Sequence, residues 1–285
     1  MATSIDFAGG WSDVPDFAGE EGGAVLNAAI DLYTEGRACW TESGFDLSLH
    51  LAVSPDSHLG TSSSTNLAWV ELIAGLTRRT LSDVERAEQA ARIERAMGEK
   101  GGKQDQYAAA LGGINLLRFG GADEPAEVTP IVLPEPATAE LAECCLLCHA
   151  GSSPDSGDLH AQVWRRFAEG DVRVRQCLRA IRDSVEPARS ALEEGDWAAL
   201  AAEMTRNREL ARALGGGAVT ERMDALFQAG ERAGALGAKG CGAGGGGYVL
   251  FLCEQDARSR VEQALTELGA PVRRFGFVPR RGVDG

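Results

Sequence analysis

A short stretch, His58–Thr65, has the residue types of an anion-binding loop. It reads HLGTSSST and stands directly before Leu67–Leu76, an apolar run that predicts a helix. The first N–H groups of a helix have no intrahelical partner, and the helix dipole favours negative charge there. A Gly before them lets the backbone approach a ligand closely. One hydroxyl would suffice to cap the helix, but four in a row with a Gly favour phosphate binding.

A second stretch, Gly101–Tyr107, offers a carboxylate beside a cation. It reads GGKQDQY and places Asp105 two residues after Lys103. Phosphoryl transfer needs positioning, charge neutralisation and a group that takes the acceptor proton. A nearby cation would keep Asp105 ionised and aimed. From the residues alone, a turn Asp beside a surface Lys is the competing interpretation.

The elements around these stretches indicate an α+β protein. Strands are predicted over 45–53, over 112–119, at 144–149 and over 247–254, with a last strand over 271–279. Helices are predicted over 67–76, 81–97, about 158–194, 197–214, 220–235 and 257–269. A Pro- and Glu-rich stretch at 121–141 separates two halves. We therefore expect one domain over residues 1–135 and a second over 136–285, each with about two layers.

Composition restricts the partners. The 285 residues carry a formal net charge of -14 and a sequence pI near 4.8, so the surface repels nucleic acid and anionic lipid. No stretch resembles a signal peptide or a membrane span. The seven Cys show no disulfide framework, which predicts a cytoplasmic protein with reduced thiols. The cluster CCLLCH at 144–149 is interpreted as a buried strand rather than a metal site, since alternation would send Cys144 and Cys145 to opposite faces.

Four segments together resemble the GHMP kinase family. SPDSHLGTSSS is similar to the family's central phosphate-loop motif, in the version found in fucokinases. DFAGGWSDVPDFAGEEGGAVLNAAI, at 6–30, resembles the first motif of bacterial heptose-phosphate kinases and fucokinases. GALGAKGCGAGGGGYVLFL, at 234–252, resembles the third, glycine-rich motif, and GKQDQYAAALGG, at 102–113, matches the heptose-kinase branch. The resemblance implies a phosphate-loop domain followed by a ferredoxin-like domain that closes over the cleft.

The resemblance implies roles at the nucleotide end of this cleft. ATP would be held by the loop at Leu59, Gly60, Thr61, Ser62, Ser63 and Ser64. Mg²⁺ would be bound by one hydroxyl, of Ser63 or Ser62, and by Glu94; the alternative for Glu94 is an exposed helix residue paired with Arg neighbours. Asp105 is implied as the acceptor base, with Lys103 beside it as a second catalytic residue.

Other segments would meet the acceptor. The resemblance implies that Asp13 hydrogen-bonds substrate hydroxyls, with Trp11 beside it and with Gly10 permitting close approach; a plain turn is the alternative. The glycine-rich run predicts a flat backbone beside the transferred phosphate, at Gly244 and Gly245. Ser153 follows a strand end near the substrate, and His160 is either a contact or a surface helix residue.

The implied activity is an ATP-dependent kinase for the anomeric hydroxyl of a sugar or sugar phosphate. A sugar already phosphorylated at its far end, of the heptose or octose type, is the expected acceptor, and a homodimer is left open. Three departures keep a non-catalytic sugar- or nucleotide-sensing relative as the alternative. Ser4 stands where relatives carry an Arg, His58 replaces the first Gly of the loop, and the segment that helps hold adenine is short. A decarboxylase is a third option, against which GKQDQY argues.

Overall fold

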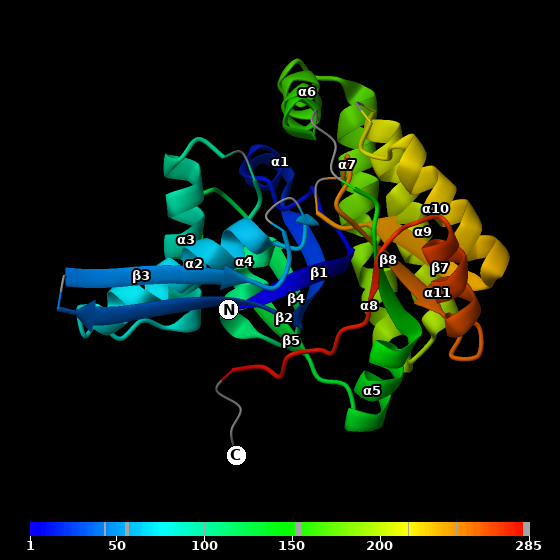
Figure 1. Cartoon of the computed structure of the whole chain (residues 1–285). Helices are drawn as coiled ribbons and strands as arrows, with labels where there is room; N and C mark the ends of the chain where they lie inside the picture. Colours follow the sequence, from blue (N-terminus) through cyan, green and yellow to red (C-terminus); the bar gives the residue numbers. More distant parts are fainter. Residues whose placement is uncertain are drawn as a thin grey trace.

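The structure is a computed structural model that describes residues 1–42, 44–54, 57–99, 101–151, 156–215, 217–242 and 244–281. Helices and strands are interspersed along the chain (Figure 1). In order they are β1 (Ala2–Ala8), α1 (Pro15–Glu21), β2 (Gly23–Thr41), β3 (Gly44–Leu51), α2 (Thr61–Leu76), α3 (Asp83–Ala96), α4 (Gln104–Leu111), β4 (Ile114–Phe119), β5 (Glu127–Ile131), α5 (Glu135–Cys144), β6 (Cys145–His149), α6 (Ser156–Ala168), α7 (Val172–Asp183), α8 (Val185–Glu194), α9 (Trp197–Leu214), α10 (Glu221–Ala233), β7 (Ala235–Gly240), β8 (Tyr248–Cys253), α11 (Arg258–Glu267) and β9 (Val272–Arg273). Runs of consecutive helices occur at α2–α4 and α6–α10.

The first sheet is antiparallel and has the order β1-β2-β4-β5, with β3 paired to the far half of β2. The near half of β2 is a continuous apolar run that is buried on both faces, which is the pattern of a central strand. Its far half pairs with β3 in a ribbon that leaves the body of the molecule (Figure 1). Trp40 near the tip of this ribbon is 79% exposed.

The second sheet has the order β7-β8-β6-β9 and is also antiparallel. Side chains alternate along β8, so that Leu250 and Leu252 join the core shared with the first sheet, whereas Val249 and Phe251 face α10 and α11. The buried-strand interpretation of CCLLCH is confirmed. The expected alternation of Cys144 and Cys145 is wrong, because Cys144 ends α5 and both side chains enter the same core.

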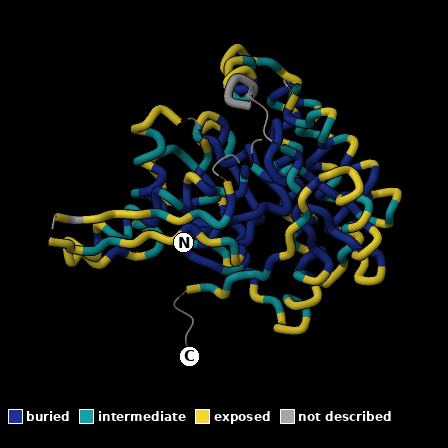
Figure 2. The backbone as a smooth tube through the Cα atoms, in the orientation of Figure 1, coloured by how far each residue is buried: buried dark blue, intermediate teal, exposed yellow. Residues whose placement is uncertain are grey.

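The elements stack in layers around three larger cores. Helices α2, α3 and α4 cover one face of the first sheet, and α8 and α9 lie between the two sheets. Helices α10 and α11 cover the far face of the second sheet. A fourth core joins α1 and the preceding loop to α6 and α7. Figure 2 shows the buried backbone concentrated along this stack, while the ribbon and the outer helices are exposed. The α+β class and the mixed layers are therefore as expected.

Several element predictions need correction. The region 158–194 is three helices, since Gly170 in the left-handed conformation and the Asp171 cap break the first and a tight turn at Ser184 breaks the second. The last strand is only Val272–Arg273. After it the chain returns to the first sheet, where the Val278 N–H donates to the Ala29 carbonyl at 2.9 Å. Helices α1, α4 and α5 and strands β1, β2, β5 and β7 were not predicted.

The domain boundary at 135/136 stays a prediction. All strands of the first sheet precede it and all strands of the second follow it, and this supports the boundary. Within the described part of the chain, no helix has the length and apolar character needed to cross a bilayer.

Candidate active site

A cleft of about 520 Å³ lies where the N-terminus of α2 meets α4, the end of α3 and the loop before α1. Helix α6 stands over this part of the molecule (Figure 1). The cleft gathers residues from both halves of the sequence, because His160 and Ala161 of α6 and Gly242 of the glycine-rich turn after β7 line it. The lining residues are Trp11, Asp13, Val14, His58, Gly60, Thr61, Ser62, Ser63, Glu94, Gly98, Glu99, Gly101, Gly102, Gln104, Asp105, His160, Ala161 and Gly242.

The predicted anion loop forms the N-terminus of α2. The hydroxyl run was expected to precede the helix. In the structure it forms the first turn of the helix, from Thr61 onward. Gly60 is its N-cap and has φ +66°, a conformation that Gly adopts at little cost. His58 also takes a left-handed φ of +58°. The first N–H groups of α2 therefore open onto the cleft.

The hydroxyls of the loop divide into two groups. Thr61, Ser62 and Ser63 line the cleft. Ser64 is fully buried instead, and its hydroxyl lies 2.7 Å from that of Thr34. Leu59 is fully buried in the core between the sheets. Of the six residues predicted to hold ATP, the structure therefore places four in the cleft and makes two supports of the loop.

Asp105 lies in the first turn of α4 and points toward the loop. Its Oδ1 accepts a hydrogen bond of 2.7 Å from the hydroxyl of Ser4, which is 2% exposed. A Cβ on Gly60 would lie 2.8 Å from the Asp105 Cβ, so only Gly permits this approach. Loss of hydration, with smaller contributions from Asp13, Asp6 and Glu94, raises the pKa of Asp105 to about 7. Such a group exchanges a proton near neutral pH.

Asp13 is a second buried carboxyl in the cleft wall. Its Oδ2 accepts a hydrogen bond of 3.1 Å from the Gln104 N–H at the start of α4. A Cβ on Gly102 would lie 1.8 Å from this oxygen, so Gly102 is required for the contact. Burial raises the pKa of Asp13 to about 6. Asp13 thus faces the cleft and also fixes the helix that carries Asp105.

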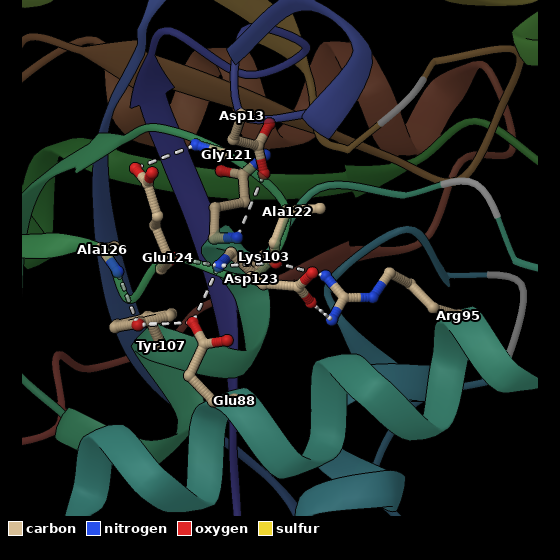
Figure 3. A network of polar contacts seen from close by, with 11 residues as sticks. Asp13, Glu88, Arg95, Lys103, Tyr107, Gly121, Ala122, Asp123, Glu124 and Ala126 are labelled. Atoms are coloured by element: carbon tan, nitrogen blue, oxygen red, sulfur yellow. Dashed lines mark hydrogen bonds and ion pairs between the residues drawn. The ribbon is translucent and has the colours of Figure 1, made fainter. Parts of the chain in front are cut away.

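The expected partnership of Lys103 with Asp105 is wrong. The Lys103 side chain points to α3, where its Nζ lies 2.8 Å from Glu88 Oε1 and 2.6 Å from the Glu124 carbonyl oxygen (Figure 3). The hydroxyl of Tyr107 donates to the same Glu88 oxygen. Lys103 is buried and is not among the residues that line the cleft. Its ion pair therefore anchors α4 to α3 and does not keep Asp105 ionised.

Glu94 and Ser63 fit the predicted Mg²⁺ site. The Ser63 hydroxyl lies 3.0 Å from Glu94 Oε1, so one cation can contact both oxygens. Glu94 also accepts hydrogen bonds from the amides of Asn66 at 3.1 Å and Gln106 at 2.6 Å and from the Ser62 hydroxyl, and burial raises its pKa. The described residues contain no group of three or more His, Cys, Asp or Glu side chains able to hold a metal by themselves. The remaining ligands would have to be phosphate oxygens and water.

The glycine-rich turn after β7 packs against the predicted anion loop at Ser57 and His58. A Cβ on Gly247 would lie 2.6 Å from the Ser57 carbonyl oxygen, and Gly242 lines the cleft beside His58. Gly245 donates its N–H to the Ala218 carbonyl oxygen, and Gly244 lines a separate cavity of about 30 Å³. The close backbone approach is as expected, but it involves Gly242 more than Gly244 and Gly245.

The remaining predicted substrate contacts differ in placement. Trp11 lines the cleft, has φ +84°, and stacks on His160 of α6 with ring centroids 4.7 Å apart. Gly10 lies behind it, where a Cβ would meet Asp6 Oδ2 at 2.7 Å. Ser153 lies outside the described residues.

Sequence reasoning missed two polar supports of the site. In the sequence, Ser4 was noted only because the resemblance places an Arg at this position. In the structure its hydroxyl donates a hydrogen bond to Asp105. Lys239 of β7 belongs to the glycine-rich motif and was given no role of its own. In the structure its Nζ lies 2.6 Å from Asp6 Oδ2, beneath Gly10. A buried Lys in an otherwise small and apolar strand is a signal that could have identified the second of these.

Comparison with known proteins gives matches over most of the chain. The model for the GHMP kinases N terminal domain matches residues 24–113, and the model for the GHMP kinases C terminal region matches residues 188–270. A D-glycero-alpha-D-manno-heptose 7-phosphate kinase of Campylobacter jejuni is 24% identical over 92% of this chain and 77% of its own length. A mevalonate kinase of Thermococcus onnurineus is 28% identical over 86% of this chain and 70% of its own.

Solved structures share the fold. The crystal structure of a D-glycero-D-manno-heptose 1-phosphate kinase from Bacteriodes thetaiotaomicron superposes with a TM-score of 0.80 at 23% identity. The match covers 98% of this chain and 95% of that one.

Proposed function

Because this chain belongs to the GHMP kinase family, we propose that it is an ATP-dependent kinase that phosphorylates the anomeric hydroxyl of a sugar or sugar phosphate. One observation carries the proposal. A carboxyl with a pKa raised to about 7, that of Asp105, lies against the Gly60 turn at the N-terminus of α2. A proton acceptor and a phosphate-binding helix end therefore meet at one point of the cleft.

The loop holds the triphosphate in this proposal. The free N–H groups of Thr61, Ser62 and Ser63 donate to phosphate oxygens, and the dipole of α2 favours their charge. Bound Mg²⁺ would neutralise charge on the phosphates, and Ser63 and Glu94 are the residues placed to hold it. The net charge of -14 makes these local donors necessary.

Asp105 acts on the acceptor. It accepts the proton of the anomeric hydroxyl as the hydroxyl oxygen bonds to the terminal phosphorus of ATP and the bond to ADP breaks. The anomeric hydroxyl is more acidic than the other hydroxyls of a sugar, so a carboxylate base suits it. Asp13 hydrogen-bonds the ring hydroxyls from the same wall. Ser63, Glu94 and Asp105 line one cleft, and this favours catalysis over a non-catalytic sensing role.

The position of phosphorylation is tested on the product. A heptose, with and without a 7-phosphate, is incubated with Mg-ATP and the product is examined by phosphorus and proton NMR. We expect coupling of the new phosphate to the anomeric proton. Coupling to another carbinol proton, or a product that contains no sugar phosphate ester, would refute the proposal.

Nucleotide binding is tested by thermal shift. Mg-ATP raises the melting temperature of the wild-type protein by mass action. Ser63→Ala reduces this rise, because it removes one Mg²⁺ ligand. Gly60→Val abolishes it, because the side chain meets Ser4 and Asp105 within 3 Å and blocks the backbone. The exposed Gly75, which has open space around its Cβ position, provides the control variant Gly75→Ala. Absence of any shift with purine nucleotides in the wild-type protein would contradict the kinase assignment.

A further inference from the structure

The charge of the cleft wall bears on which acceptor it takes. Its described lining residues include four carboxyl groups and no Lys or Arg. The other polar groups are hydroxyls, one side-chain amide, the imidazoles of His58 and His160, the indole of Trp11 and backbone. The carboxyl groups belong to Asp13, Glu94, Glu99 and Asp105.

Three basic residues close to the cleft in sequence or space are already paired. Lys103 is bound to Glu88, and Lys239 lies on Asp6 at 2.6 Å and borders the small second cavity. Arg95 follows the lining residue Glu94, but its guanidinium donates to the Ala122 carbonyl at 2.5 Å. All three side chains are bound to groups of the protein itself and are not placed to bind a second phosphate.

His160 lines the cleft, but burial lowers its pKa to about 4, so its ring is neutral at physiological pH. Lys100, next to the lining residue Gly101, lies outside the described residues and is addressed by the experiment below.

In place of cations, this wall presents aromatic rings. Trp11 and His160 line the cleft with ring centroids 4.7 Å apart, and Trp164 supports both from α6. The Trp11 backbone is held at φ +84°, which is rare for a bulky residue, by the packing of its loop on α6. Flat apolar rings next to carboxylates suit a polyol, whose C–H face packs on the ring while its hydroxyls donate to the carboxylates.

We infer that the acceptor is an uncharged sugar with no phosphate at its far end. The inference rests on the proposed kinase function and replaces the expectation of a sugar phosphate. A phosphate at the far end would bring nearly two negative charges into a cleft whose described lining contains carboxyl groups and no Lys or Arg. The Trp11 and His160 rings select the sugar by its apolar face.

The test compares paired acceptors under Mg-ATP. We expect kcat/KM for a free hexose or heptose to exceed that for the same sugar with a terminal phosphate by at least about 10-fold. A preference for the phosphorylated sugar would overturn the inference and leave the kinase function in place, and its loss in Lys100→Ala would identify the cation responsible. Turnover of neither form, despite a thermal shift with Mg-ATP, would overturn the proposed function itself.

A variant tests the aromatic wall. Trp11→Ala lowers kcat/KM for the free sugar by about 10-fold or more, mainly through KM, and leaves the thermal shift with Mg-ATP unchanged. Trp40→Ala, on the exposed ribbon, is the matched control and keeps wild-type kinetics. If Trp11→Ala is folded by the thermal-shift criterion and retains the wild-type KM for sugar, the aromatic part of the inference is wrong.

Discussion

Turnover in Asp105→Asn falls by about 10²- to 10⁴-fold, the usual contribution of a general base. Asn keeps the size of the side chain and an oxygen that still accepts the hydrogen bond from Ser4. The loop and α4 therefore stay in place, and Mg-ATP still raises the melting temperature. Steady-state kinetics and thermal shift on one preparation measure both. Near-wild-type turnover would assign Asp105 to structure alone.

The pH dependence follows from the same residue. A base must be ionised, so kcat/KM rises with pH through about 7, the pKa to which burial raises Asp105. Ser4→Ala moves this midpoint upward, because the Ser4 hydroxyl stabilises the ionised carboxylate and lowers its pKa. A pH profile with the same midpoint in wild type and Ser4→Ala would show that another group controls the rate.

Stability gives an independent readout of Asp105. Its folded-state pKa lies above the ordinary Asp value of 3.8, so its neutral form favours folding, and that contribution is lost as pH rises through about 7. At pH 8 Asp105→Asn therefore melts above the wild type, and the difference shrinks toward pH 5. Asp46→Asn, at an exposed position of β3, should show no such pattern.

Lys103→Met destabilises the fold by about 3 kcal/mol, because it leaves Glu88 buried without its cation. Met has a similar length and no charge, so the loss is mostly electrostatic. Chemical denaturation measures it. The double variant Lys103→Met/Glu88→Gln recovers part of the loss, since the uncompensated charge is gone.

A surface ion pair provides the control for Lys103. Arg189 and Glu193 form an i,i+4 pair on α8 with both side chains partly exposed, and Arg189→Met should cost less than about 1 kcal/mol. If Lys103→Met keeps the full stability of the wild type but loses turnover as Asp105→Asn does, Lys103 has a catalytic role after all.

Local sequence patterns were enough to predict an anion-binding loop and several of the regular elements. A Gly followed by hydroxyls and an apolar run favours phosphate binding over simple capping, because a helix start needs partners for its N–H groups. The regular helix Trp197–Leu214 and the strand β8 were predictable for a similar reason, since their apolar periodicity is local. The short helix α4 was missed, because GGKQDQYAAAL begins with glycines and has only eight helical residues.

Tertiary structure alone decided which groups meet. Lys103 and Asp105 are two residues apart at the start of one helix, yet their side chains point to opposite sides, and packing rather than spacing sets their partners. Ser4 lies 101 positions from Asp105 and reaches it because β1 runs beside the loop. Burial then raised the pKa of Asp105 and Asp13, which no local pattern encodes. The sequence therefore fixes the kinds of side chain available, while long-range packing fixes their charge states and partners.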